Sequence, residues 1–405
     1  MTISKSMMIL VVFFGYLIPV IAQNPRIAIK NVTLYPSPSA KPILNATILL
    51  NNGKIEKVGA LSRVKIPKEY RIIDGTGKFA TAGFWNCHVH LIGEPWANAK
   101  NRSPEIDKSL KDMLTSRGYM YAFDLAQFDI TNINDIRKLI ESKVIDGPTL
   151  YAVGVPITSK SPFYIAPAKL PELHTTDEVQ KHIHLQAEQG ANGVKLWAGS
   201  PTGNAVEYMD KSLIVSAVEE AKKYGFPVFA HPTDNLGIRV AVENGVSILA
   251  HTSPDNYSPW DSSLVETMIK HKVSLIPTLK LYSWELKRQN NYSEDNPLIK
   301  TAIQQLNAFY KAGGHILFGT DVGYMADYDP KDEYELMQKS GMSFEAILGS
   351  LTINPSDRFG FSSVKGQVTA GFDADIVLLK EDPKKDIKNF TQVVTTIHKG
   401  RVIYE

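Results

Sequence analysis

The sequence predicts an α/β fold: a (β/α)8 TIM-type barrel with a small β-sandwich domain formed from both chain ends. In the middle of the chain, eight short apolar runs alternate with helical stretches, as they do in a barrel of parallel strands. At both ends this alternation gives way to short strands and tight turns. The chain has 405 residues, of which 43% are hydrophobic and 21% charged, so it can bury a core of that size.

The start of the chain is predicted to be a cleavable signal peptide over residues 1–22. Lys5 precedes an unbroken apolar stretch that ends in Ala22, a small residue of the kind found at cleavage points. The stretch is short for a bilayer span and contains Gly15 and Pro19, so we expect no stable membrane anchor. The mature protein is therefore expected to be exported, either to a periplasm or out of the cell.

Two β-rich segments flank the predicted barrel. Near the N-terminus, Asn52-Gly53 separates two apolar strands, and this dipeptide favours the positive φ angles of a two-residue hairpin turn. Near the C-terminus, Lys399-Gly400 separates two further strands in the same way. The predicted domains are the N-terminal part of the sandwich, the barrel and the C-terminal part of the sandwich, at residues 23–80, 81–360 and 361–405.

The barrel prediction depends on eight strand-helix units. The apolar runs end near His88, Asp124, Val153, Leu196, Ala230, Ala250, Pro277 and Gly319. The helical stretches between them include Ile106–Ser116, Ile133–Ser142, Asp177–Gln189, Lys211–Tyr224, Leu236–Asn244, Leu264–Lys272 and Leu298–Lys311. A doubly wound open sheet shows the same alternation, so periodicity alone leaves that alternative open.

Composition narrows the classes of function. Lys and Arg number 44 against 42 Asp and Glu, a formal net charge of +2, so the chain lacks the positive field of a nucleic-acid-binding protein. Cys87 is the only cysteine, which excludes an intrachain disulfide and a zinc site built from several thiolates. Histidine and carboxylate therefore remain as the metal ligands to look for, and no nucleic-acid partner is expected.

Potential metal ligands occur at the ends of five of the eight predicted strands. On the first strand, His88 and His90 are two residues apart, so in an extended chain both face the same way and can bind one ion. His182 and His184 have the same spacing inside a predicted helix, where the two rings point roughly 200° apart. The second pair is therefore predicted to lie on a solvated helix face.

Four further residues complete this set: Lys195 within an apolar strand, His231 and His251 at the ends of strands, and Asp321 after a strand. Burial favours the neutral amine of Lys195, and a neutral amine can capture carbon dioxide as a carbamate that bridges two cations. Taken singly, each residue has an ordinary explanation: a lysine that reaches solvent, a buried core histidine or a helix-capping aspartate. Together the six converge only if the strands close into a barrel.

Several motifs accompany these ligands: Thr81-Ala82-Gly83-Phe84 before His88-Val89-His90, Gly319-Thr320-Asp321, Gly366-Gln367-Val368, and the run from Gly371 to Leu378. With them, the chain resembles the amidohydrolase superfamily of metal-dependent hydrolases over nearly all of its length after the predicted signal peptide. It resembles most the branch of imidazolonepropionase-like proteins and Xaa-Pro dipeptidases, through the segments Gly193–Gly199, Gly237-Ile238-Arg239 and Leu351–Pro355.

The resemblance implies a hydrolase that binds two divalent metal ions, taken to be Zn²⁺, and cleaves a C–N amide bond with a metal-bound hydroxide. It implies three groups of ligands: His88 and His90 with Asp321 for the first ion, His231 and His251 for the second, and carboxylated Lys195 as the bridge. Two cations ionise a shared water near neutral pH and polarise the substrate carbonyl. Asp321 would be the catalytic residue that carries the proton from this water to the leaving amine.

The chain also departs from its relatives in two places. Thr233 stands two residues after His231, where close relatives often have a second histidine. The segment Ser159–Tyr164 replaces a Gly-Gly-His stretch that many relatives show after the third strand. Both departures affect substrate recognition rather than the set of metal ligands.

Two alternatives belong to other classes. A deaminase of the same superfamily would bind one ion through His88, His90, His231 and Asp321, with Asp234 near the fifth strand to move protons. A barrel that only binds a carbohydrate or peptide would be indicated by a broken ligand set, and here the set is complete. Metal analysis separates the three, with two ions per chain expected for the hydrolase, one for the deaminase and none for the binding protein.

The expected substrate is a small amide, either a dipeptide or an N-acyl amino acid with a free carboxylate. A cation and a phenol on a strand-end loop could bind that carboxylate. Lys280 and Tyr282 after the seventh strand offer such a pair, and Lys160 with Tyr164 after the third strand offers another. For each lysine, a solvated surface position is the competing explanation. The sequence leaves open whether the chains assemble into a homo-oligomer.

Overall fold

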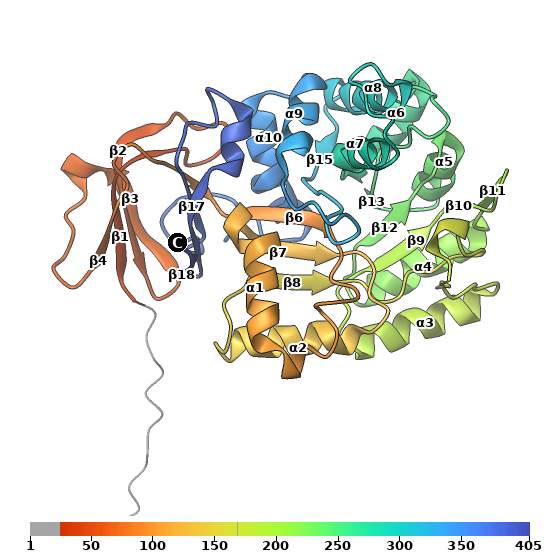
Figure 1. The fold of residues 1–405 in the computed structure, drawn as a ribbon, viewed down its shortest axis with the longest axis horizontal. Helices are drawn as coiled ribbons and strands as arrows, with labels where there is room; N and C mark the ends of the chain where they lie inside the picture. The colour runs from red at the N-terminus through yellow and green to blue at the C-terminus, as the bar shows by residue number, and fades with distance from the viewer. Residues whose placement is uncertain (1–24, 168) are drawn as a thin grey trace, which may run out of the picture.

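The computed structural model describes residues 25–405 with the exception of residue 168 (Figure 1). The predicted signal peptide lies outside the described residues. Within the described part of the chain, no helix is both long enough and apolar enough to cross a membrane.

Eight parallel strands occupy the middle of the chain, one in each apolar run that the sequence predicts. They form a three-stranded sheet of β6 (Phe84–Val89), β7 (Tyr119–Asp124) and β8 (Thr149–Ala152), and a five-stranded sheet of β9 (Val194–Trp197), β12 (Val228–His231), β13 (Ile248–Leu249), β14 (Ser274–Leu275) and β15 (His315–Ile316). Single bridges join the edges of the two sheets, between Val153 and Gly193 and between Val89 and Val322. The fold is therefore TIM-barrel-like, although the regular ladders do not run continuously around it.

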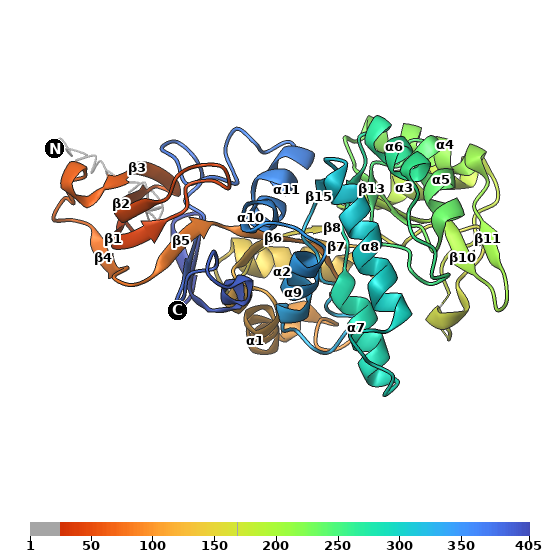
Figure 2. The same ribbon diagram turned by 90° about the horizontal axis from the view of Figure 1, so that it is seen from above.

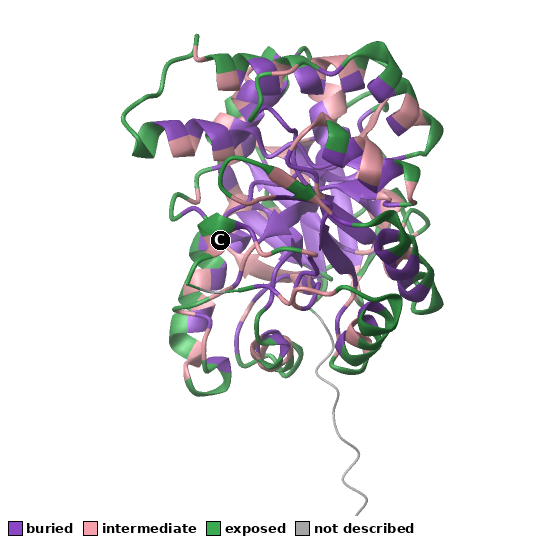
Figure 3. Ribbon diagram, turned by 90° about the vertical axis from the view of Figure 1, so that its right-hand side faces the viewer, coloured by how far each residue is buried: buried purple, intermediate pink, exposed green. Residues whose placement is uncertain are grey.

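The helices pack outside these strands and turn their apolar faces inward. Figure 3 shows the strands as a buried centre surrounded by helices with exposed outer faces. The α-helices are α1 (Ser103–Met113), α2 (Ile130–Glu141), α3 (Thr176–Glu188), α4 (Lys211–Lys223), α5 (Asn235–Glu243), α6 (Ser262–Lys270), α7 (Leu279–Arg288), α8 (Pro297–Lys311), α9 (Lys331–Lys339), α10 (Phe344–Leu351) and α11 (Ile353–Arg358). The seven predicted helices are thereby confirmed as α1 to α6 and α8, whereas α7 and α9 to α11 were not predicted.

Shorter elements occur in the barrel part of the chain and in both flanking segments. A hairpin of β10 (Gly199–Pro201) and β11 (Val206–Tyr208) follows β9. The 3-10 helices are η1 (Leu61–Arg63), η2 (Ala99–Asn101), η3 (Thr115–Arg117), η4 (Phe163–Ile165) and η5 (Ile387–Thr391).

Helix α3 shows how the local sequence sets an element boundary. The hydroxyl of Thr175 accepts a hydrogen bond from the backbone N–H of Glu178 at 3.2 Å, and the Glu178 carboxylate accepts one from the backbone N–H of Thr175 at 2.9 Å. This capping box satisfies donors that the first helical turn would otherwise leave unpaired. The helix then buries Val179 and Ile183, four residues apart, against the strands.

Both chain ends contribute to one eight-stranded sheet beside the barrel (Figures 1 and 2). Its strands are β1 (Ile27–Leu34), β2 (Ile43–Asn51), β3 (Lys54–Ala60), β4 (Arg71–Asp74), β5 (Phe79–Ala82), β16 (Ile376–Leu379), β17 (Val393–His398) and β18 (Arg401–Tyr404). The order is β18-β17-β16-β5-β1-β2-β3, with β4 also paired to β1. The hairpin predicted at Asn52-Gly53 is confirmed, since both residues have positive φ angles, 48° and 74°, between β2 and β3.

Asp375 links this sheet to the barrel. Its carboxylate accepts hydrogen bonds from Nδ1 of His398 at 2.9 Å, from the backbone N–H of Lys399 at 2.8 Å and from the hydroxyl of Tyr121 on β7. Burial alone raises the pKa of a carboxyl group, but the nearby His398 and these hydrogen bonds outweigh it and lower the pKa of Asp375 to about 2. The charged form of this buried side chain is therefore the one that the fold stabilises.

Replacing Asp375 with asparagine is expected to lower the free energy of unfolding by about 3–5 kcal/mol, because it removes one partner of a buried charged network. In the wild type, a depressed folded-state pKa gives stability that is present above the unfolded pKa of about 3.9 and is lost as pH falls toward 2. Urea denaturation of the two proteins at several pH values measures both effects. As a control, Asp112→Asn removes an exposed ion pair with Lys108 and should cost less than about 1 kcal/mol.

Candidate metal centre and active site

The predicted ligands lie at the carboxyl ends of parallel strands. His88 is within β6, Lys195 is within β9, and His231 is the last residue of β12. His251 follows β13, and Asp321 follows β15. Because carboxyl ends of parallel strands meet on one face, the topology brings these residues together. Most of them are nearly inaccessible to solvent: His88 is 1% exposed, Lys195 2%, Asp321 4% and His251 5%.

His88, His90 and Asp321 are in direct contact. The Nε2 atom of His90 lies 2.8 Å from Oδ1 of Asp321, and the Nε2 atom of His88 lies 3.4 Å from the same oxygen. The two Nε2 atoms are 3.2 Å apart. Candidate ligand atoms of His88, His251 and Asp321 also lie within 4.8 Å of one another. These distances place four side chains around one small volume.

The two remaining histidine rings continue this cluster. The ring centroid of His251 is 4.7 Å from that of His88 and 4.7 Å from that of His231. Trp197, at the end of β9, stacks on His231 with its centroid 5.2 Å away and an interplanar angle of 16°. The indole therefore fixes the plane of the His231 ring.

Lys195 lies beneath this cluster. Its ammonium is 5.5 Å from the centroid of the Trp197 ring. Burial lowers the pKa of Lys195 to about 7, and the negative charge of Asp321 only partly opposes this change. Its positive charge in turn contributes to lowering the pKa of His88, His231 and His251. The structure thus brings all six predicted ligands into one region.

The donor set fits divalent metal ions. Nδ1 of His88 and Nδ1 of His90 are buried without a hydrogen-bond partner, and the contact of Oδ1 of Asp321 with Nε2 of His90 lacks hydrogen-bond geometry. Burial lowers the pKa of His231 to about 3 and that of His88 and His251 well below the usual range. Neutral imidazoles and a carboxylate are the nitrogen and oxygen ligands that zinc and related cations prefer.

Thr278 fixes the orientation of His251. Its hydroxyl donates a hydrogen bond to the carbonyl of Pro277 at 2.8 Å, so it accepts the bond from Nδ1 of His251 at 2.7 Å. With the proton on Nδ1, the Nε2 atom of His251 keeps its lone pair for a metal. Thr278 was not predicted from the sequence, where its only signal is its position next to a strand end.

Two more polar residues that were not predicted support the ligands. Nδ2 of Asn86 donates to the hydroxyl of Thr320 at 2.7 Å, and its carbonyl oxygen accepts from the backbone N–H of Thr320 at 3.2 Å. These bonds tie β6 to the segment that carries Asp321, whose own φ angle of 62° is unusual for a residue other than glycine. Asp124 ends β7 with its Oδ1 atom 3.9 Å from Nδ1 of His90.

Tyr164 lies at the open side of the cluster. Its hydroxyl accepts a hydrogen bond from the indole N–H of Trp197 at 2.9 Å and lies 3.5 Å from Nε2 of His231. The side chain is 44% exposed, although burial around the hydroxyl raises the pKa of the phenol. Tyr164 is therefore accessible from solvent and adjacent to the candidate ligands. The neighbouring Lys160 is half exposed and pairs with Glu172 at 3.5 Å.

Lys280 and Tyr282 do not lie on a loop, and that part of the prediction is wrong. Both belong to helix α7, whose buried residues include Leu279, Tyr282 and Leu286 at helical spacing. The Lys280 ammonium is 1% exposed, donates to the backbone carbonyls of residues 327 and 329, and lies 3.1 Å from the Asp327 carboxylate. The Tyr282 hydroxyl donates to the carbonyl of residue 252 at 2.7 Å. Both polar groups are thus engaged within the protein.

Asp234 has a structural role in the fold. One carboxylate oxygen accepts a hydrogen bond from the backbone N–H of Gly237 at 2.8 Å and caps helix α5. The other accepts one from the Tyr208 hydroxyl at 2.5 Å. These two hydrogen bonds explain the presence of an aspartate at position 234 without a proton-transfer role in a deaminase reaction.

Comparison with known proteins places this fold and site in a family. The family model described as the amidohydrolase family matches residues 79–403. Ochratoxinase of Aspergillus niger is 23% identical over 90% of this chain and 84% of its own length. A crystal structure of a Xaa-Pro dipeptidase with bound methionine has a TM-score of 0.80 and 18% identity, over 94% of this chain and 100% of that chain. A putative prolidase from Bifidobacterium longum has a TM-score of 0.80 and 24% identity, over 95% of both chains.

The match covers most of the chain, so the chain belongs to the amidohydrolase family. This confirms the resemblance that the sequence motifs indicate. The protein is a metal-dependent hydrolase, an enzyme that acts on carbon-nitrogen amide bonds of small molecules.

Proposed function

We propose that the protein hydrolyses the amide bond of a dipeptide or an N-acyl amino acid, with two divalent metal ions that are taken to be Zn²⁺. The observation that carries the proposal is the convergence of buried, neutral histidines and one carboxylate at the strand ends. Similarity to a Xaa-Pro dipeptidase and a putative prolidase supports the peptide-like class of substrate.

The residues would hold the two ions in the arrangement that the resemblance implies. His88, His90 and Asp321 would bind the first ion, and their contacts of 2.8–3.4 Å support this grouping. His231 and His251 would bind the second, and the Thr278 hydrogen bond presents Nε2 of His251 for that purpose.

Lys195 would bridge the two ions as a carbamate. Its neutral amine attacks carbon dioxide, forms a nitrogen-carbon bond and releases one proton, so the product is an anionic oxygen ligand. Its position supports this role: Lys195 is 2% exposed, and its positive charge is close enough to lower the pKa of His88, His231 and His251. An unpaired ammonium at that depth would be costly, whereas an anion between two cations is not.

Asp321 would move the proton during hydrolysis. When bound, two divalent ions ionise a water near neutral pH and polarise the substrate carbonyl. The Asp321 carboxylate then takes the proton of the attacking water and delivers it to the nitrogen of the breaking carbon-nitrogen bond. Asn86 supports this role because its two hydrogen bonds to Thr320 tie the segment that carries Asp321 to β6.

Tyr164 is proposed to contact the substrate at the open side of the site. Tyr164→Phe keeps the aromatic ring and removes only the hydroxyl that lies beside His231, so kcat/KM is expected to fall roughly tenfold. The metal content of the variant should equal that of the wild type. Steady-state kinetics with metal analysis checks both, and Tyr292→Phe, on an exposed loop, serves as the control. Unchanged kcat/KM in Tyr164→Phe would remove this residue from the proposal.

Metal analysis of purified protein, together with a library of dipeptides and N-acyl amino acids, tests the proposed function. Two ions per chain and release of an amino acid from a library member are the expected results. One ion per chain with ammonia release would favour the deaminase, although Asp234 as a helix cap gives that reading no support. Two ions without any product would contradict the substrate class and leave the metal site standing.

The finer organisation of the chain belongs to the same proposal. The bridges between Val153 and Gly193 and between Val89 and Val322 support closure of the two parallel sheets into one barrel. A shared buried cluster of β1, β2, β5 and β16 side chains supports a sandwich made from both ends, although β5 (Phe79–Ala82) crosses the proposed division at residue 80. We also propose that residues 1–22 act as a cleavable signal peptide that directs export of the protein.

A further inference from the structure

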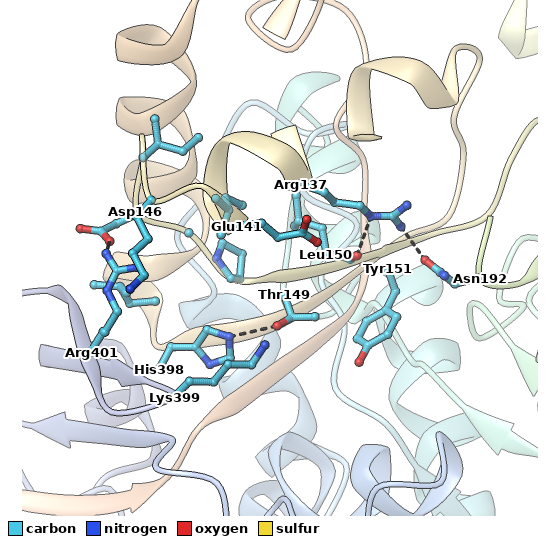
Figure 4. Close-up of a pocket in the computed structure, with 16 residues that line it drawn as sticks. Arg137, Glu141, Asp146, Thr149, Leu150, Tyr151, Asn192, His398, Lys399 and Arg401 are labelled. Carbon is cyan, nitrogen blue, oxygen red and sulfur yellow. Dashed lines mark hydrogen bonds and ion pairs between the residues drawn. The ribbon is translucent and has the colours of Figure 1, made fainter. Parts of the chain in front are cut away.

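A pocket of about 480 Å³ lies on the other face of the barrel, away from the candidate metal centre. Figure 4 shows that it is bounded on one side by α2 and β8 and on the other by the β17-β18 hairpin. Thr149, the first residue of β8, lines it, so the pocket lies at the amino ends of the strands whose carboxyl ends carry the metal ligands. Its size falls in the range of pockets that hold small molecules.

The charged side chains that line this pocket are unbalanced. Four cations, Arg137, Lys143, Lys399 and Arg401, face two carboxylates, Glu141 and Asp146. One of these carboxylates is already used, since Asp146 forms an ion pair with Arg401 (Figure 4). The pocket therefore carries a net positive charge.

Among these cations, Arg137 has hydrogen-bond partners that are all uncharged. Its guanidinium donates to the carbonyls of residues 150 and 190, at 3.0 and 2.9 Å, and to the side-chain oxygens of Asn134 and Asn192. All four acceptors are uncharged, and among the described residues no carboxylate forms an ion pair with Arg137, although the charges of Asp124 and Glu141 act on it from further away. Burial lowers the pKa of Arg137. A partly desolvated cation whose charge is only partly compensated attracts an anion from solution.

Tyr151 joins this pocket to an aromatic one. Its hydroxyl has no hydrogen-bond partner among the described residues, while its ring stacks on Trp85, with centroids 5.7 Å apart, and lies 6.1 Å from that of Phe361. A second pocket of about 550 Å³ shares Tyr151 and Asn192 with the first and is lined by Phe123, Phe226, Phe359 and Phe361. A cationic pocket thus adjoins one that is rich in aromatic side chains but also includes Arg358.

We propose that these two adjoining pockets form a second, non-catalytic site for a small aromatic carboxylate. The carboxylate would lie near Arg137 and the Tyr151 hydroxyl, and the ring would lie against the aromatic residues of the neighbouring pocket. Such a ligand would contact α2 and β8 through its carboxylate and the segment after α11 through its ring. Since it binds only the folded protein, it raises the melting temperature by mass action.

Thermal unfolding of the metal-loaded full chain with three probes tests this site. Phenylacetate carries both the ring and the charge, acetate carries only the charge, and phenylacetamide carries only the ring. Phenylacetate is expected to raise the melting temperature in a saturable way and at lower concentration than the other two. No saturable rise with phenylacetate, or an equal effect of all three probes, would overturn the proposal.

Variants decide where the probe binds. Arg137→Gln should weaken phenylacetate binding about tenfold, as measured by calorimetry, because it removes a charged hydrogen-bond donor. Tyr151→Phe keeps the ring and removes only the unpaired hydroxyl, so it serves if Arg137→Gln does not fold. Lys270→Gln, which removes an exposed cation at the end of α6, should bind like the wild type. Wild-type affinity in both pocket variants would mean that phenylacetate binds elsewhere, for example at the metal centre, and would refute the site.

Discussion

Asp321→Asn is expected to lower kcat/KM by roughly 10³-fold or more while the protein still folds. An amide has nearly the size of the carboxylate, but it cannot accept the proton of the attacking water or carry it to the leaving nitrogen. The substitution also removes the negative charge of the carboxylate, whose Oδ1 atom lies 2.8 Å from Nε2 of His90 and 3.4 Å from Nε2 of His88. The variant should therefore bind less metal at the first position, which metal analysis measures independently of activity.

The control for this prediction is Asp295→Asn, the same chemical change at a carboxylate that is 89% exposed and pairs only with Lys300. It should leave both activity and metal content unchanged. Asp321 is buried, so a small decrease in the stability of Asp321→Asn is expected. Thermal unfolding of the variant shows whether it is still folded, and therefore whether the lost activity reflects a missing catalytic group or an unfolded protein. If Asp321→Asn kept more than a tenth of the wild-type kcat/KM, Asp321 could not be the proton carrier.

The positions of the candidate ligands near strand ends were predictable because the signals that place them there are local. An apolar run followed by a histidine or aspartate predicts both the strand and the position of the side chain at its carboxyl end. The spacing of His88 and His90 places both rings on one face of β6, and the structure brings their Nε2 atoms to 3.2 Å. Convergence of residues from β9, β12 and β13 then follows from parallel pairing.

The burial of the Lys280 side chain was not predictable, because the residues that it contacts are distant in the sequence. Its ammonium is held by residues 327 and 329, and the carboxylate of Glu333 accepts its backbone N–H at 2.7 Å. Pro277 and Thr278 follow β14 and make the segment resemble a loop, whereas helix α7 begins directly at Leu279. Only the long-range contacts show that this lysine cannot reach a substrate carboxylate.

The supporting residues were missed for a related reason. Asn86, Asp124 and Thr278 are common residue types whose roles depend on a neighbour from another strand, such as the 2.7 Å contact between Thr278 and His251. Tyr164, by contrast, lies in the segment where the chain departs from its relatives, and there the departure itself was the signal. The structure places its hydroxyl 3.5 Å from His231.

Lys195→Ala is expected to lower kcat/KM by roughly 10³-fold or more and to reduce bound metal to about one ion per chain or fewer. The substitution removes the amine that would carry the bridging carbamate, and it leaves a cavity beneath the cluster of His88, His231 and His251. A short carboxylic acid such as acetate or propionate fits a cavity of that kind and supplies an anionic oxygen ligand. Added acetate should therefore restore part of the activity and part of the metal content.

Two comparisons make this test specific to carboxylation. Lys195→Arg keeps the positive charge but cannot form the carbamate, so it should be inactive and, with its cavity filled, insensitive to acetate. Wild-type protein prepared in ¹³C-bicarbonate should show a carbamate carbon resonance that is absent from both variants, a readout that does not depend on turnover. Rescue by acetate also excludes misfolding as the cause of the lost activity, because an unfolded chain has no cavity to fill. Full activity of Lys195→Ala, or a wild-type spectrum without the carbamate signal, would show that the buried amine of Lys195 on β9 is not the bridge.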